Sequence, residues 1–295
     1  MPAPKARQPT LRGYLNCGQD EANPLDRMRV ARRLSTVLLA VMSTQALMGL
    51  AFRAAYRDVE WIRTTWFGND WVTLVVAAPL LLIGLRRTAV GSVQGLLLWL
   101  GLIGFALYNY AFYLFGAALI AFLPVYVVAV VLAATVLILA LSQIDAIRFA
   151  HSVRPTAPVR LLGGSLVFIA VGLASAWIAM WAAYVFAGRP TPVEPEAFKL
   201  VAALDLSLMV PTLGIGGVLL WRRRPWGLVI SAIASVQAAL YLLVLSVNSV
   251  VSIHRGLTNV PGELPIWGTL TLITGTVALG LFASVRSERA AFLKR

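Results

Sequence analysis

The chain contains a very long stretch without charge: from residue 88 to residue 143 there is no Asp, Glu, Lys or Arg. Such a stretch is stable in lipid or in a very large core, and a chain of 295 residues cannot bury that much apolar surface. Charged residues make up 13% of the whole chain, against about a quarter in soluble domains. The sequence therefore predicts an integral membrane protein.

Eight apolar stretches are long enough to cross a bilayer. A helix rises about 1.5 Å per residue, so about 20 residues cross a hydrocarbon core of about 30 Å. We expect an all-α integral membrane protein, an eight-span helical bundle. The expected spans are residues 34–52, 65–85, 89–112, 117–141, 161–186, 200–221, 225–247 and 265–285.

The basic residues gather on one side of these spans. With the N-terminus inside, the inner segments hold 19 Lys and Arg and the outer segments hold 6. This asymmetry is the positive-inside pattern of membrane proteins, so we expect both termini in the cytoplasm and assign the basic excess to orientation, not to nucleic acid. The inner parts are a basic N-terminal tail (1–33), a linker (143–160) and a C-terminal tail (287–295). The single cysteine, Cys17, lies in the first tail, where a free thiol suits a reducing cytosol.

The chain divides into two halves of four spans, residues 34–142 and 161–286. Several features recur 136 residues apart, among them Arg53 with Arg189 and Gly91 with Gly227. Because each half has an even number of spans, both halves begin on the same side of the membrane. The sequence thus predicts two parallel four-helix repeats, related by an axis along the membrane normal.

Two acidic residues, Asp70 and Asp205, lie next to apolar stretches that are too short to cross alone. We therefore expect both carboxylates just below the outer headgroups. A charge there needs a partner, and the candidates are Arg53 for Asp70 and Arg189 for Asp205. For Asp70, a helix N-cap is the alternative.

Polar residues also occur near the outer end of the third span. Tyr108 and Asn109 are candidates to join the carboxylates in an outward-facing ligand site between the halves, whereas Tyr113 is expected in the interfacial belt. Both histidines fall outside the spans, so paired haem ligands within the membrane are not expected. Neither a metal site nor a cofactor is predicted.

Three strings carry a resemblance: LYNYAFYLFGAA (107–118), NDWVTLVVAAPLL (69–81) and the pair ALDLSLMVP (203–211) and LLWRRRPWG (219–227). They resemble a group of uncharacterised multi-pass membrane proteins of bacteria, common in actinobacteria. The likeness extends over most of residues 34–285 and implies a location in the bacterial cytoplasmic membrane. It implies no activity.

Three classes of function fit these features. The first is a small-solute permease or channel with a site between the halves. The second is a non-catalytic subunit, sensor or assembly factor, which the lack of charge in mid-membrane favours. The third is an embedded enzyme that uses Asp70 or Asp205 as acid or base on a lipid-like substrate. The expected partners are the bilayer and a small-molecule or lipid ligand.

Overall fold

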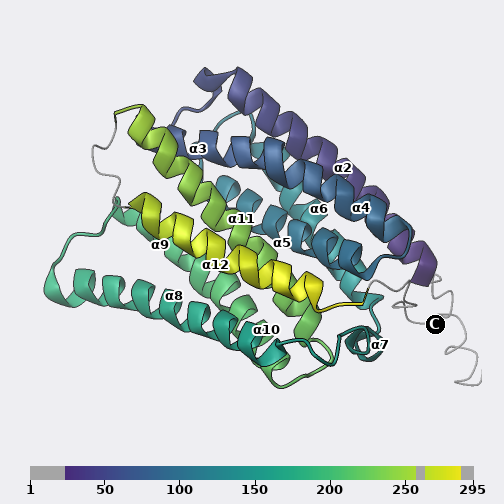
Figure 1. The fold of residues 1–295 in the computed structure, drawn as a ribbon. Coiled ribbons are helices and arrows are strands. Elements are labelled where there is room, and N and C mark those ends of the chain that lie inside the picture. Colours follow the sequence, from purple (N-terminus) through teal and green to yellow (C-terminus); the bar gives the residue numbers. More distant parts are fainter. Residues whose placement is uncertain (1–23, 257–262, 287–295) are drawn as a thin grey trace, which may run out of the picture.

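The computed structural model describes residues 24–256 and 263–286, and within these ranges every regular element is a helix or a helical turn (Figure 1). The elements are α2 (Pro24–Ala51), η1 (Arg53–Ala55), α3 (Glu60–Val72), η2 (Thr73–Ala77), α4 (Ala78–Ala89), α5 (Val93–Gly116), α6 (Leu123–Ser142), α7 (Ala146–Ala150), α8 (Val159–Ala187), α9 (Pro195–Leu204), η3 (Asp205–Met209), α10 (Val210–Trp221), α11 (Gly227–His254) and α12 (Leu264–Ala283).

Eight helices are long and apolar enough to span a membrane, which confirms the predicted all-α fold of eight spans. Two of them are compound, because π-helical turns join α3 to α4 and α9 to α10. The helices differ from the predicted boundaries by a few residues. The largest difference is at α2, which begins at Pro24 and so takes in the end of the predicted tail. Its arginines can extend along the helix to reach the headgroup layer.

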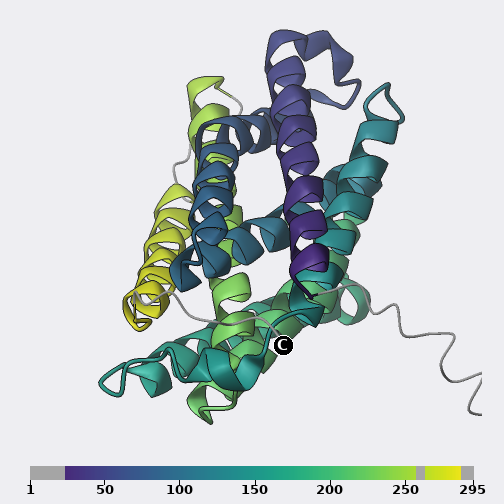
Figure 2. The ribbon, with the colours of Figure 1, turned by 90° about the vertical axis from the view of Figure 1, so that its right-hand side faces the viewer.

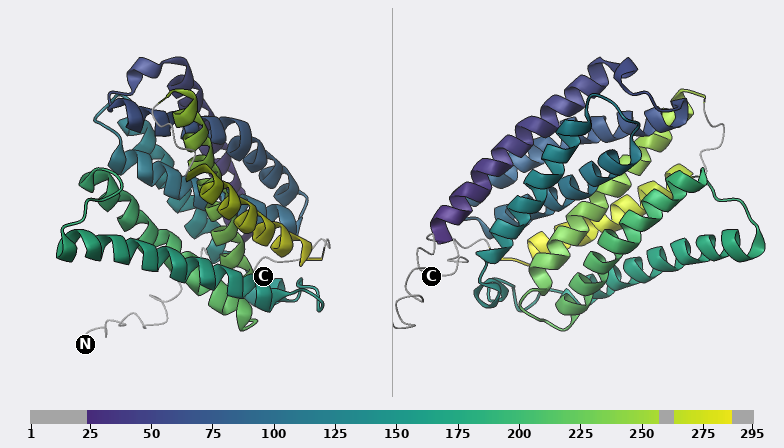
Figure 3. Two further views of the ribbon diagram at one scale, coloured as in Figure 1. Left: turned by 60° about the vertical axis from the view of Figure 1, so that its left-hand side comes forward. Right: turned by 180° about the vertical axis from the view of Figure 1, so that it is seen from behind.

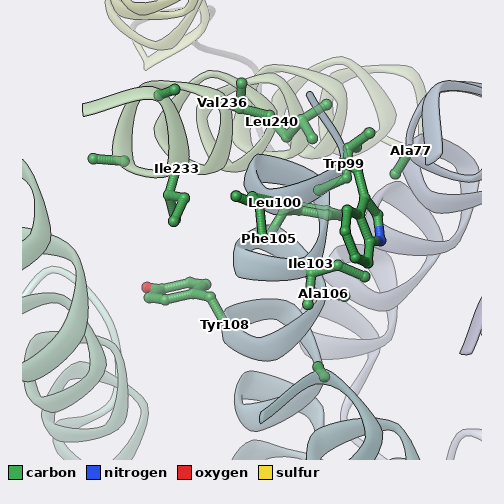
Figure 4. Close-up of a cluster of buried hydrophobic side chains, with 14 of the residues drawn as sticks. Ala77, Trp99, Leu100, Ile103, Phe105, Ala106, Tyr108, Ile233, Val236 and Leu240 are labelled. Carbon is green, nitrogen blue, oxygen red and sulfur yellow. The ribbon is translucent and has the colours of Figure 1, made fainter. Parts of the chain in front are cut away.

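The two most buried spans, α5 and α11, form the centre of the bundle (Figures 1 and 4). Glycines allow this close approach. A methyl group at Gly101 would lie 2.6 Å from Cβ of Val236, and one at Gly104 would lie 2.8 Å from Cγ2 of Ile233. On their other sides α5 packs against α6 and α11 packs against α12, and Figure 2 shows α6 and α12 on opposite sides of the molecule.

The most peripheral span is α8, which packs mainly against α10 and runs along one edge of the bundle (Figure 3). Many of its large apolar side chains are exposed, including Leu161, Phe168 and Phe186. In a soluble protein such a surface would aggregate, whereas acyl chains cover it in a bilayer. The exposed apolar side chains of α8 thus fit a lipid-facing helix.

The connections gather at two ends of the bundle. The start of α2, the ends of α4 and α10, and α7 lie at one end (Figure 1), which we call the arginine-rich end. It carries Arg86, Arg87, Arg148, Arg154, Arg160, Arg222, Arg223 and Arg224. The opposite end holds η1, the turn between α5 and α6, and the connection between α8 and α9.

The two compound spans have the same local order of π turn and proline. Each π turn is followed at once by a short helix with proline at its second position, Pro79 or Pro211. A proline ring crowds the carbonyl four residues earlier, and in both spans that carbonyl lies inside the π turn. The interval from Thr73 to Asp205, the first residues of the turns, equals that from Pro79 to Pro211.

The close helix contacts follow the same interval of 132 residues (73 to 205). Gly84 and Gly216 are separated by this interval, and so are Gly95 and Gly227. Gly91 and Arg223, which both have a positive φ angle, are separated by it as well. This register differs from the 136-residue offset of the arginine pairs. It matches Asp205 with Thr73, and not with Asp70.

Candidate ligand site in the cavity at the opposite end

A cavity of about 730 Å³ opens between the two halves at the end opposite the arginines. Its walls come from α3 and α5 of the first half and from α9, α11 and the start of α12 of the second. The polar residues that line it are Thr65, Asn69, Tyr108, Asn109, Glu194, Glu196, Tyr241, Asn248, Ser249, Ser252 and Glu263.

Three buried carboxamides line this cavity with unpaired atoms. Nδ2 of Asn69, Nδ2 of Asn109 and Oδ1 of Asn248 have no hydrogen-bond partner within the described part of the chain. These side chains are 2%, 3% and 9% exposed. An unsatisfied buried polar group costs about 1–3 kcal/mol, and each of these three atoms is itself covered by protein, so a ligand can bond to it only after the side chain turns toward the cavity.

The position of Asn248 depends on a glycine of the neighbouring helix. A methyl group at Gly68 of α3 would overlap Oδ1 of Asn248. The absence of a side chain at this position therefore lets the carboxamide of α11 lie against the backbone of α3. The next residue of α3, Asn69, also lines the cavity.

The charged residues that line the cavity are all acidic. Glu194, Glu196 and Glu263 contribute carboxylates, and no described lining residue is a Lys, Arg or His. Aromatic rings form much of the wall, among them Trp66, Phe112, Phe115 and Trp267. Rings whose faces are electron-rich, next to carboxylates, make a surface that attracts organic cations.

Asp205 lies directly behind this wall. It is 1% exposed, and its carboxylate accepts hydrogen bonds from the hydroxyl of Tyr108 and, at 2.9 Å, from Nε1 of Trp177 on α8. The ring of Tyr108 packs edge-on against Tyr241, with centroids 5.0 Å apart. Figure 4 shows Tyr108 leaving α5 on the side away from Trp99. Asp205 thus orients a lining side chain without lining the cavity itself.

Asp70 is enclosed in a separate network within the first half. It is fully buried and accepts hydrogen bonds from Tyr56 Oη (2.6 Å), Tyr113 Oη (2.8 Å) and Gln45 Nε2 (3.1 Å). Tyr110 in turn donates to Oε1 of Gln45 at 2.9 Å. Burial, and then the nearby Asp70, raise the pKa of Tyr56 far above its usual range, so its hydroxyl stays protonated and remains a donor.

This network corrects two expectations. Asp70 lies near the end of α3, whose N-cap is Val59, so the N-cap alternative is wrong. Tyr113 is fully buried and bonded to Asp70, so its placement in the interfacial belt is also wrong. Asp70 faces the first half whereas Asn69 faces the cavity, because neighbouring residues on a helix point about 100° apart.

The expected arginine partners are elsewhere. The guanidinium of Arg53 lies over the ring of Phe67, with Cζ 5.2 Å from the ring centroid, and Arg189 is exposed. Among the residues that the structure describes, neither arginine forms an ion pair with a carboxylate. Tyrosine, tryptophan and glutamine side chains take the place of the predicted basic partners.

Of the six predicted site residues, Tyr108 and Asn109 line the cavity, and Asp70, Asp205, Arg53 and Arg189 do not. The sequence did not predict Asn69 or Trp177 for this site, whereas Asn248, Ser249 and Tyr241 take positions in the second half comparable to those of Tyr108 and Asn109. Asn69 and Asn248 could both be recognised in the sequence as candidate polar contacts, because an amide next to an apolar span must find a hydrogen bond. Comparison with protein-family models, with curated proteins and with solved structures found no match for this chain.

Proposed function

We propose that this protein is a permease of the bacterial cytoplasmic membrane whose outward-facing cavity binds a small organic cation. The observation that carries the proposal is the cavity with its three unpaired carboxamides. The positive-inside pattern supports an outward-facing orientation, because the cavity lies at the end opposite the arginines. The resemblance to bacterial multi-pass proteins supports the choice of membrane.

The lining supports the choice of ligand. Carboxylates at the mouth attract a positive charge, and aromatic rings stack on the apolar part of an organic cation. The carboxamides of Asn69, Asn109 and Asn248 can donate and accept hydrogen bonds once they turn toward the cavity, so we expect the ligand to carry hydrogen-bonding groups as well as charge. These features together disfavour an anion.

The repeat supports a transport role. We infer that the two halves arose by duplication in the 132-residue register, which pairs the π turns and the glycine contacts. In many transporters the substrate lies between two such repeats. Here both spans that contain a π turn contribute to the cavity wall, through α3 and α9.

A second candidate, a ligand-binding sensor, is favoured by the packing beyond the cavity. Leu100 and Phe105 of α5 are fully buried beside Val236 of α11 (Figure 4), which closes the route to the arginine-rich end. The enzyme alternative has less support. Each buried carboxylate, Asp70 and Asp205, already accepts hydrogen bonds from two or three protein side chains.

Ethidium is a suitable probe, because it is an aromatic cation with amino groups. In lipid nanodiscs we expect saturable binding, measured by fluorescence anisotropy, and much weaker binding of neutral phenanthridine. Replacing Glu194, Glu196 and Glu263 by Gln should lower the affinity about tenfold at low salt. Glu60→Gln is the matched control, because Glu60 is an exposed carboxylate at the same end that pairs with Arg63 and Arg255 outside the cavity.

Ethidium entry into proteoliposomes loaded with DNA separates the two candidates. Binding together with faster entry supports a permease. Binding without entry would favour the sensor, and equal binding by the triple variant and by the wild type would contradict the cavity as a cation site.

A further inference from the structure

A second hollow, of about 450 Å³, lies at the arginine-rich end between α2 and α4. Its polar wall is made by Arg29, Arg32, Arg33 and Thr36 of α2 and by Arg86 of α4. The four α2 residues follow the spacing i, i+3, i+4, i+7, so they share one helix face. The end of α4 adds its arginine from across the hollow.

The charge in this hollow is unbalanced. Arg29 pairs with Asp26 at the surface. Arg32, Arg33 and Arg86 form no ion pair with any carboxylate in the described ranges 24–256 and 263–286. Guanidinium groups held close together without an anion repel one another, and a phosphate that accepts bidentate hydrogen bonds offsets this repulsion.

The remaining wall of the hollow is apolar and distinguishes between two sources of phosphate. Leu39, Leu82, Leu85 and Ala89 line it on the membrane side, and Leu82 is 38% exposed. A free phosphate ion has no apolar part that could pack against this surface. A phospholipid would place its phosphate among the arginines and the start of its acyl chains along these leucines.

We propose that this hollow binds the phosphodiester of an anionic phospholipid, with Arg32, Arg33 and Arg86 as the anion-binding groups. The site belongs to the first half. At the corresponding end of the second half, Arg222, Arg223 and Arg224 do not line this hollow. This difference supplies a control with the same change of charge, and the proposal is independent of the solute cavity.

The test is native mass spectrometry of the full chain titrated with defined lipids. We expect cardiolipin or phosphatidylglycerol to bind at least tenfold more tightly than phosphatidylcholine. In the triple variant R32Q/R33Q/R86Q this preference should fall about tenfold, and in R222Q/R223Q/R224Q it should change less than twofold. R32K/R33K/R86K keeps the charge but lacks the planar guanidinium groups, so we expect an intermediate loss of the lipid preference. This variant replaces the Gln variant in the test if the Gln variant fails to fold.

Two competition measurements distinguish a phospholipid from a free phosphate as the ligand. Inorganic phosphate and glycerol phosphate, which lack acyl chains, should not displace the lipid at equal concentration. Displacement by either would overturn the assignment to a lipid. Equal losses in the two Gln variants would overturn the site, because they would show a general effect of charge at this end of the bundle.

Discussion

At the residue scale, the two buried carboxylates hold side chains in place within the protein. Asp70 ties Gln45, Tyr56 and Tyr113 together, and Asp205 holds Tyr108 against the cavity. The sequence located both acids within spans but suggested the wrong partners. The reason is geometric: the length of an apolar stretch gives the depth of a residue, whereas its direction around the helix depends on packing.

Asp70→Ala should be more destabilising than Asp205→Ala. The first change removes three hydrogen bonds to a fully buried side chain and the second removes two, and each hydrogen bond contributes about 0.5–1.5 kcal/mol. Thermal unfolding of the purified variants in one detergent gives the comparison. A larger loss for Asp205→Ala would contradict the described networks.

Gly68→Ala should weaken ethidium binding about tenfold, because the added methyl group displaces the Asn248 carboxamide from the cavity wall. Gly268→Ala is the matched control at the same end, since a methyl group there meets nothing within 4 Å. Unchanged affinity in Gly68→Ala would show that Asn248 does not contact the probe.

At the element scale, the eight spans followed from the sequence because charge-free runs of sufficient length have few other stable solutions. The 132-residue interval between the two π turns did not follow from it. Arginines mark where a chain leaves the membrane and so tolerate shifts of a few residues. Prolines beside the π turns and glycines at helix contacts follow this interval instead, as in Pro79 with Pro211 and Gly84 with Gly216.

The central helix pair gives a prediction at this scale. Gly101→Ala should destabilise the bundle by about 1–3 kcal/mol, because its methyl group would lie 2.6 Å from Cβ of Val236 and force α5 and α11 apart. Gly172→Ala on α8 meets nothing within 4 Å and should be neutral or stabilising. Thermal unfolding measures both, and equal effects would argue against close packing at Gly101.

At the scale of the whole molecule, the two ends of the bundle have different chemistry. One end presents arginines around a hollow with an apolar wall, and the other presents carboxylates and aromatic rings around the larger cavity. The sequence predicted this polarity from its basic residues. It could not predict the cavity, because the walls come from five helices whose faces are set only when the halves pack together.

The central claim is that the cavity between the halves faces outward and holds the cation. Ser249→Cys in a Cys17→Ser background places one thiol in the cavity wall, and Ser142→Cys places one at the arginine-rich end. An impermeant thiol reagent added to intact spheroplasts should label the Ser249→Cys protein and spare the Ser142→Cys protein, and ethidium should slow the labelling. Labelling of the Ser142→Cys protein alone, or labelling at position 249 that ethidium leaves unchanged, would contradict the claim.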